Sequence, residues 1–152
     1  MAIAALAETI LPRTIDSPGA KDAQVEEFIV DVVVHCLLDK EQNTFLRGLK
    51  RAQLYSQEQF GYSLSECDDD ECFQVVRWME QASKPWLDVP VVIKIRNKLF
   101  GRTFFQLVKT LTVEGYCTSE VGATQGLAFD AVPGSYVPCL TIHADHKTWA
   151  LT

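Results

Sequence analysis

The sequence predicts an all-α protein: a single domain of about five helices with a long irregular C-terminal tail. Apolar residues recur at helical spacing through most of the first 115 residues. From residue 116 onward, glycines and prolines separate short apolar pieces, which is typical of irregular chain. The 152 residues have the length of one domain, so we expect one domain over 1–152, with a helical core over about 3–115 and a tail over about 116–152.

Two helices are expected in the first 38 residues. Residues 3–11 are largely apolar and end at Pro12, which has no amide hydrogen and restrains the residue before it. Ser17-Pro18-Gly19 then marks a turn. Asp22 is the expected N-cap of a second helix that runs to about residue 38. The apolar residues expected on its inward face are Val25, Phe28, Ile29, Val32, Cys36 and Leu37.

A third helix should follow directly. Asp39, with Gln42 three residues later, forms a variant capping box that opens a helix to about residue 59. Gly61 stands where a glycine commonly ends a helix in the left-handed conformation. The apolar stripe of this helix should comprise Phe45, Leu46, Leu49, Ala52 and Tyr55.

The fourth helix is expected to be capped by Ser63 or Ser65 and closed by Lys84-Pro85. The acidic run 68–71 would complement the positive end of the helix dipole if it lies in the first turn. The fifth helix is expected over about 91–115, although Val91-Val92-Ile93 also favours a strand. The inward residues expected on the fourth helix are Cys72, Phe73, Val76 and Met79.

The charge and the apolar runs exclude several classes of partner. The net charge of −6 argues against a nucleic-acid-binding module and against electrostatic docking to anionic lipid. No apolar run approaches the ~18 residues of a membrane span, so we expect no direct membrane span. The N-terminus lacks the basic region of a signal peptide, which leaves two possibilities: a cytoplasmic protein, or an exported protein without its leader.

The sequence holds no motif for a catalytic, cofactor-binding or metal site. Nucleotide-binding glycine loops, the haem-attachment motif Cys-x-x-Cys-His and the Gly-x-Ser-x-Gly elbow are all missing. His143 and His146 with Asp145 have a spacing that can hold a metal, but a structural zinc site needs four ligands. His35 and Cys36 are neighbours on a helix and point apart, so we interpret them as a surface histidine beside a buried cysteine.

Two chain segments resemble the gluconate 2-dehydrogenase subunit 3 family. The family's N-terminal pattern AETIIP…D-x-PGA is similar to Ala7-Glu8-Thr9-Ile10-Leu11-Pro12-Arg13-Thr14 and Asp16-Ser17-Pro18-Gly19-Ala20. Its block LT…GY-x-TSE-x-GATQ…VPG-x-Y is similar to Leu111-Thr112, Gly115-Tyr116, Thr118-Ser119-Glu120, Gly122-Ala123-Thr124-Gln125 and Val132-Pro133-Gly134 with Tyr136. Cys139 resembles a cysteine that often follows this block.

The resemblance implies an accessory role. Family members are small subunits of periplasmic or membrane-associated dehydrogenases, whose large subunit is an FAD-dependent (GMC-type) flavoprotein that oxidises a sugar or sugar acid. A cytochrome c subunit often accepts the electrons, so FAD and haem c are expected in partner subunits and no cofactor in this chain. The family commonly bears a twin-arginine export signal, which this sequence lacks. We expect a periplasmic protein, or a cytoplasmic one if the chain has no leader.

The C-terminal segment is the expected partner surface. Its apolar residues are too numerous for a free tail, so they should be buried against this domain or another chain. The odd number of cysteines, five, leads us to expect an intersubunit disulfide at Cys139 or, failing that, Cys117. The expected interface residues are Gly115, Tyr116, Thr118, Ser119, Glu120, Gly122, Thr124, Gln125, Phe129, Pro133 and Tyr136.

Two alternative functions stay open at this stage. A homo-oligomeric structural protein would bury the tail against its own copy. A stand-alone enzyme would need a base or nucleophile in a closed cleft, for which His35 and His143 are the candidates.

Overall fold

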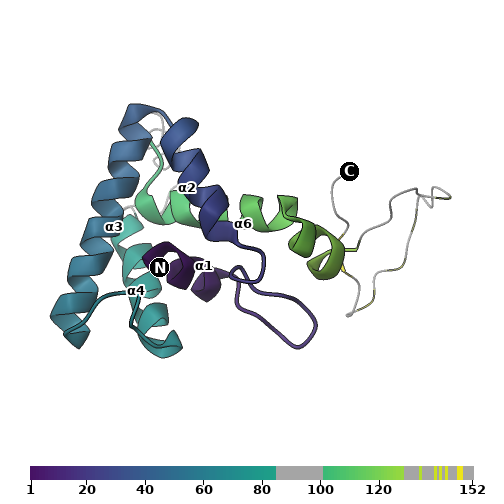
Figure 1. Cartoon of the computed structure of the whole chain (residues 1–152), viewed down its shortest axis with the longest axis horizontal. Coiled ribbons are helices and arrows are strands. Elements are labelled where there is room, and N and C mark those ends of the chain that lie inside the picture. Colours follow the sequence, from purple (N-terminus) through teal and green to yellow (C-terminus); the bar gives the residue numbers. More distant parts are fainter. Residues whose placement is uncertain are drawn as a thin grey trace.

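The fold is all-α, as the apolar spacing predicted. The computed structural model describes residues 1–84 and 101–128 and the isolated positions 134, 139, 141, 143, 147 and 148. No helix in these parts of the chain is both long and apolar enough to cross a membrane. The described helices, shown in Figure 1, are α1 (Ala2–Ile10), α2 (Val25–His35), α3 (Asp39–Phe60), α4 (Asp69–Ser83), α6 (Phe104–Thr118) and the π-helix η1 (Gly122–Gly126).

Helix α6 is the central element of the core, because α1, α2, α3 and α4 all pack against it. Gly115 allows α2 to approach closely, since a Cβ atom at this position would lie 2.7 Å from the ring of Phe28. Burial of each large apolar side chain on this helix contributes roughly 1.5–3 kcal/mol. The buried residues of α6 are Leu107, Val108, Leu111, Thr112, Gly115 and Tyr116.

Helix α2 begins later than predicted, and Asp22 is not its N-cap. The N-cap is Gln24, which has a left-handed backbone with φ of 51°. Asp22 instead accepts a hydrogen bond from the backbone nitrogen of Gly19 at 2.9 Å and so stabilises the preceding loop. The prediction that Cys36 is buried is also wrong: it lies at the C-cap, where the chain leaves the core, and it is exposed. The buried residues of this helix are Val25, Ile29 and Val33.

Helix α3 is confirmed, but its predicted capping box is wrong. The helix starts at Asp39 itself, and Leu38 is an N-cap without a side-chain hydrogen bond. Gln42 donates its amide to the carbonyl oxygen of Val33 at 3.1 Å, so this side chain joins α3 to α2 rather than capping the helix. Gly61 ends the helix with φ of 88°, as predicted. The predicted apolar stripe of this helix is incorrect at one position, because Leu46 is 54% exposed.

Helix α4 is capped by its acidic run and not by Ser63 or Ser65. The Asp68 carboxylate accepts a hydrogen bond from the backbone of Glu71, whose own side chain accepts one from the backbone of Asp68. This reciprocal arrangement satisfies two amides that the helix leaves free. Phe73 is 58% exposed, contrary to prediction. The inward residues are Cys72, Val75 and Met79.

The prediction of a single helix over 91–115 is wrong in the part that the structure describes. Residues 101–103 are not helical, and Gly101 has φ of 80°. Thr103 caps α6 through a second capping box, formed with Gln106. Arg102 holds this start against α3 by a bidentate ion pair with Glu41, at 2.9 and 3.1 Å, which lowers the pKa of that carboxyl. The part of the predicted helix before residue 101 lies outside the described residues.

The helical part also extends beyond residue 115, where the sequence predicted that it ends. Helix α6 continues to Thr118, and η1 follows after a short bend. The prediction of irregular chain is therefore wrong for residues 116–118 and 122–126. The glycines that suggested a loop allow close contacts inside this structure, at Gly122 and Gly126.

Replacement of Gly48 tests the packing of α6 on α3. A Cβ atom at Gly48 would lie 2.0 Å from the ring of Phe104. We expect Gly48→Ala to destabilise the protein by about 1–3 kcal/mol through overpacking, more than the gain of about 1 kcal/mol in helix propensity. Urea unfolding measures the change. An increase in stability on Gly48→Ala alone would contradict this contact.

Candidate functional site

The two segments that carry the family resemblance are joined by the hydroxyl group of Tyr116. This hydroxyl donates to the carbonyl oxygen of Pro18 at 2.9 Å and lies 2.8 Å from Ser17 Oγ. Tyr116 is only 7% exposed and Ser17 and Pro18 are half-buried, so both hydrogen bonds are largely shielded from water. Figure 1 shows the loop after α1, in dark purple, beside the C-terminal end of α6, in green. Residues almost 100 positions apart thus form one site.

The carboxylate of Glu8 fixes the shape of that loop, residues 11–20. One oxygen accepts from the backbone nitrogen of Arg13 at 3.0 Å, and the other from that of Lys21 at 2.8 Å. The Ala20 nitrogen also donates to the carbonyl oxygen of Leu11 at 2.9 Å, which closes the base of the loop. Gly19 leaves room for this arrangement, because a Cβ atom there would lie 2.3 Å from the Glu8 carboxylate.

Two glycines fold η1 around Tyr116. A Cβ atom at Gly126 would lie 2.1 Å from the tyrosine hydroxyl, and one at Gly122 would lie 1.9 Å from the Tyr116 carbonyl oxygen. Ser119 bridges the bend, since its hydroxyl donates to the Tyr116 carbonyl at 2.8 Å and accepts from the Gly122 nitrogen at 2.9 Å. The motif residues of this segment are therefore part of the packing of the chain itself.

The structure divides the predicted interface residues into two groups. Gly115, Tyr116 and Gly122 are buried in the chain's own core, and Ser119 is half-buried. These residues therefore lie beneath the surface and support it. The residues of the second group face outward and have polar side chains. It comprises Thr118, Glu120, Thr124 and Gln125. Three further predicted residues, Phe129, Pro133 and Tyr136, lie outside the described residues, and contact of any of these with a partner stays a prediction.

The cysteines differ in their accessibility. Cys139 is exposed and Cys117 is half-buried, and neither is bonded to another described cysteine. Cys36 is a second exposed thiol, although its helical spacing predicted that it faces the core. Burial and the nearby Cys67 raise the pKa of Cys72 to about 11, so this thiol stays protonated at neutral pH. The exposed cysteines are therefore the ones that another chain can reach.

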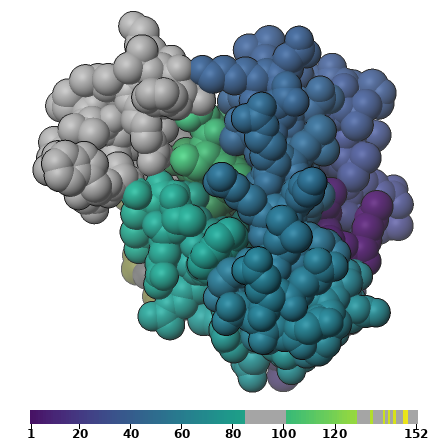
Figure 2. Space-filling model, turned by 90° about the vertical axis from the view of Figure 1, so that its left-hand side faces the viewer, coloured from purple at the N-terminus to yellow at the C-terminus, as the bar shows by residue number. Residues whose placement is uncertain are grey.

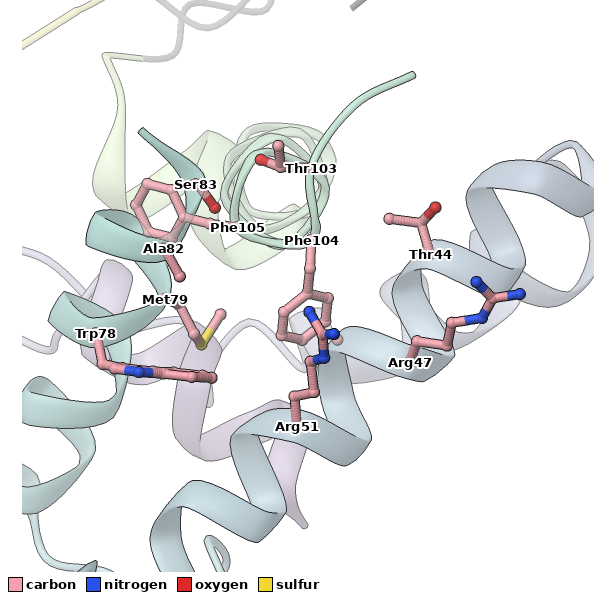
Figure 3. A pocket seen from close by; sticks show the side chains of 11 residues that line it. Thr44, Arg47, Arg51, Trp78, Met79, Ala82, Ser83, Thr103, Phe104 and Phe105 are labelled. Atoms are coloured by element: carbon pink, nitrogen blue, oxygen red, sulfur yellow. The ribbon is translucent and has the colours of Figure 1, made fainter. Parts of the chain in front are cut away.

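A second feature is a cleft of about 370 Å³ between α3, α4 and the start of α6. Trp78, Met79 and Phe104 line it, and Arg47 and Arg51 extend from α3 at its edge (Figure 3). Figure 2 shows the face where α3 and α4 flank this hollow, with α6 between them. No histidine, cysteine or carboxylate is among its described lining residues, so the cleft offers an apolar surface with two cations but no described acid–base group or thiol.

The two histidines named for the enzyme alternative lie outside this cleft. His35 and His143 are exposed, and neither lines the cleft. Among the residues that the structure describes, no group of three or more His, Cys, Asp or Glu side chains is placed to hold a metal ion. His146 and Asp145 of the predicted metal pattern lie outside that part of the chain.

A family model matches most of the chain. Its description is gluconate 2-dehydrogenase subunit 3, and the match covers residues 1–134. The matched region includes every described helix, the 11–20 loop and both segments that Tyr116 joins. No curated protein and no solved structure matches the chain.

Removal of one hydroxyl group tests the site geometry. Tyr116→Phe leaves the Pro18 carbonyl without its donor inside a shielded site, so we expect a loss of about 1–3 kcal/mol in the free energy of unfolding. Amide hydrogen exchange in the 11–20 loop should become faster as well. The matched control is Tyr62→Phe, which removes a hydrogen bond to Glu71 on the surface and should leave the loop unchanged. Equal effects of the two variants on loop exchange would contradict the role of Tyr116.

Proposed function

Because the chain belongs to the gluconate 2-dehydrogenase subunit 3 family, we propose that it is the non-catalytic small subunit of a dehydrogenase complex. It assembles with and stabilises a large FAD-dependent, GMC-type subunit that oxidises gluconate or a related sugar acid and passes the electrons to a cytochrome c. It also helps to export this partner. The single observation that carries the proposal is the family match over residues 1–134.

The hydrogen bonds made by the polar motif residues support a structural role for these residues. The Glu8 carboxylate is occupied by two backbone amides, and the Tyr116 hydroxyl by Ser17 and Pro18. Groups engaged in this way hold loops in place and are not free to bind a flavin or a sugar. On the family membership, we propose that the partner subunits hold FAD and haem c and that this chain supplies a binding surface.

The proposed partner surface is formed by the outward-facing residues of 118–125 and by the chain that follows them. Thr118, Glu120, Thr124 and Gln125 are exposed and supply hydrogen-bonding groups of both kinds. Polar groups of this kind are typical of the rim of a subunit interface, and large apolar side chains of its centre. Phe129 and Tyr136, further along the same segment, are the apolar anchors we propose.

The proposed compartment is the periplasm, where the complex is held at the membrane through its partners. Such an environment is oxidising, so an exposed thiol near the partner can form a lasting disulfide. Cys139 is exposed and follows the proposed partner surface in the sequence, which supports it as the intersubunit cysteine. Cys117 is the second candidate.

Co-purification tests the proposed assembly. The tagged chain, with any leader that its gene encodes, is expressed in its own host and recovered together with any bound protein. We expect a stoichiometric large subunit with flavin absorption and gluconate-dependent or sugar-dependent dye reduction. Deletion of the chain should lower the yield of soluble, exported flavoprotein. A chain that elutes alone and colourless contradicts the proposal, and a stable homodimer without flavoprotein would favour the homo-oligomeric alternative.

Replacement of cysteines tests the proposed disulfide. We expect the wild-type complex to run as one crosslinked band on a non-reducing gel, and Cys139→Ser to abolish that band. Cys36→Ser is the matched control, because this thiol is also exposed but lies at the C-terminal end of α2 and not in the proposed partner surface. Crosslinking that persists in Cys139→Ser and disappears in Cys117→Ser would reassign the bond, and persistence in both variants would contradict it.

A further inference from the structure

The tip of the 11–20 loop presents an isolated apolar side chain. Ile15 is 99% exposed, which means that it gains nothing from packing within the described chain. Single exposed apolar residues are common on protein surfaces, but the other exposed large apolar residues described in this chain keep part of their area covered. Leu38 and Phe73, for example, are 75% and 58% exposed. Ile15 is therefore the most exposed large apolar side chain of the described residues.

The loop holds Ile15 in a fixed position. The Thr14 nitrogen donates to the Ser17 carbonyl oxygen at 2.9 Å, so a hydrogen bond closes the chain across the tip. Below the tip, Arg13 pairs with Asp22 at 3.4 Å, and Asp22 also accepts from the Gly19 nitrogen. Together with the Glu8 and Tyr116 contacts, these bonds hold the loop on both sides. Because the backbone of this loop is already held, little backbone entropy is lost when a partner covers the tip.

Ile15 lies on the same face as one of the proposed interface residues. Residues 13–18 and Gln125 line a shallow depression of about 400 Å³. The Lys147 ammonium group donates to the Gln125 carbonyl oxygen at 2.7 Å and reaches the Asp16 carbonyl oxygen at 3.4 Å. The loop tip, the segment after α6 and part of the C-terminal region therefore meet at one surface.

We propose that Ile15 is an anchor residue that inserts into an apolar socket on the dehydrogenase subunit. This inference rests on the proposed function. The dehydrogenase subunit is identified as the partner because Ile15 lies on the same face as Gln125, a residue of the proposed partner surface. The socket is lined by aliphatic or aromatic side chains. Its rim carries an acceptor for Arg13, whose side chain is 72% exposed beside Asp22, and a donor for Asp16. Buried apolar anchors within a polar rim are the usual source of affinity in subunit interfaces.

The test compares two charge-introducing variants in binding to the isolated large subunit under reducing conditions, so that no disulfide contributes. Ile15→Asp should raise the Kd at least about tenfold, because burial of an uncompensated carboxylate is costly. Leu38→Asp is the matched control. Leu38 is also highly exposed and lies at the N-cap of α3, a position where Asp is a favourable residue. This substitution should leave the Kd unchanged. Ile15→Leu should retain most of the affinity, and no variant should unfold at a lower urea concentration than the wild type.

The outcomes separate the two proposals. If wild type binds and Ile15→Asp binds equally well, the anchor is refuted while the accessory-subunit function stands. If Leu38→Asp weakens binding as much as Ile15→Asp does, the effect is one of charge and the anchor is again refuted. If the wild-type chain does not bind the large subunit at all, both proposals are refuted.

Discussion

The shielded hydroxyl of Tyr116 is the contact on which the arrangement of the two motif segments depends. It binds Ser17 and Pro18 in the 11–20 loop, while η1 closes over it at Gly126. Each neutral hydrogen bond of this kind contributes only about 1 kcal/mol net, but an unsatisfied partner in the same place costs more. The loop therefore has one stable position relative to the end of α6. Glu8 completes the arrangement, because its carboxylate satisfies amides at both ends of the loop.

This arrangement explains how a small helical chain can serve as a subunit. The central helix α6 is held by four neighbouring helices, so its C-terminal end is a firm base for the loop and η1. The polar motif residues are engaged beneath the surface, and the residues above them are left to face outward. Ile15 and Gln125 are the clearest examples, one apolar and one polar on the same face. The complementary chemistry, including the flavin, is in our proposal supplied by the partner.

The sequence predicted the existence of the first four helices well, because their apolar spacing and the glycine at residue 61 are local signals. It failed where a side chain had two possible partners. Asp22 and Gln42 are both residues that can cap a helix, but each finds a different backbone group across a turn or a neighbouring helix. The role of Tyr116 was also beyond local reasoning, since its partners are nearly 100 residues away. The resemblance marked both segments, but only the structure explains why they occur together.

Hydrogen exchange measured by mass spectrometry, on the free chain and on the chain bound to the proposed flavoprotein partner, tests most directly whether the face built around Tyr116 is the partner surface. We predict that the partner slows exchange in peptides from the 11–20 loop and from residues 118–127, and that peptides from α3 and α4 are little affected. Slower exchange over α3 and α4, with no change in the loop or after α6, would contradict this account and point to the cleft beside Trp78 instead.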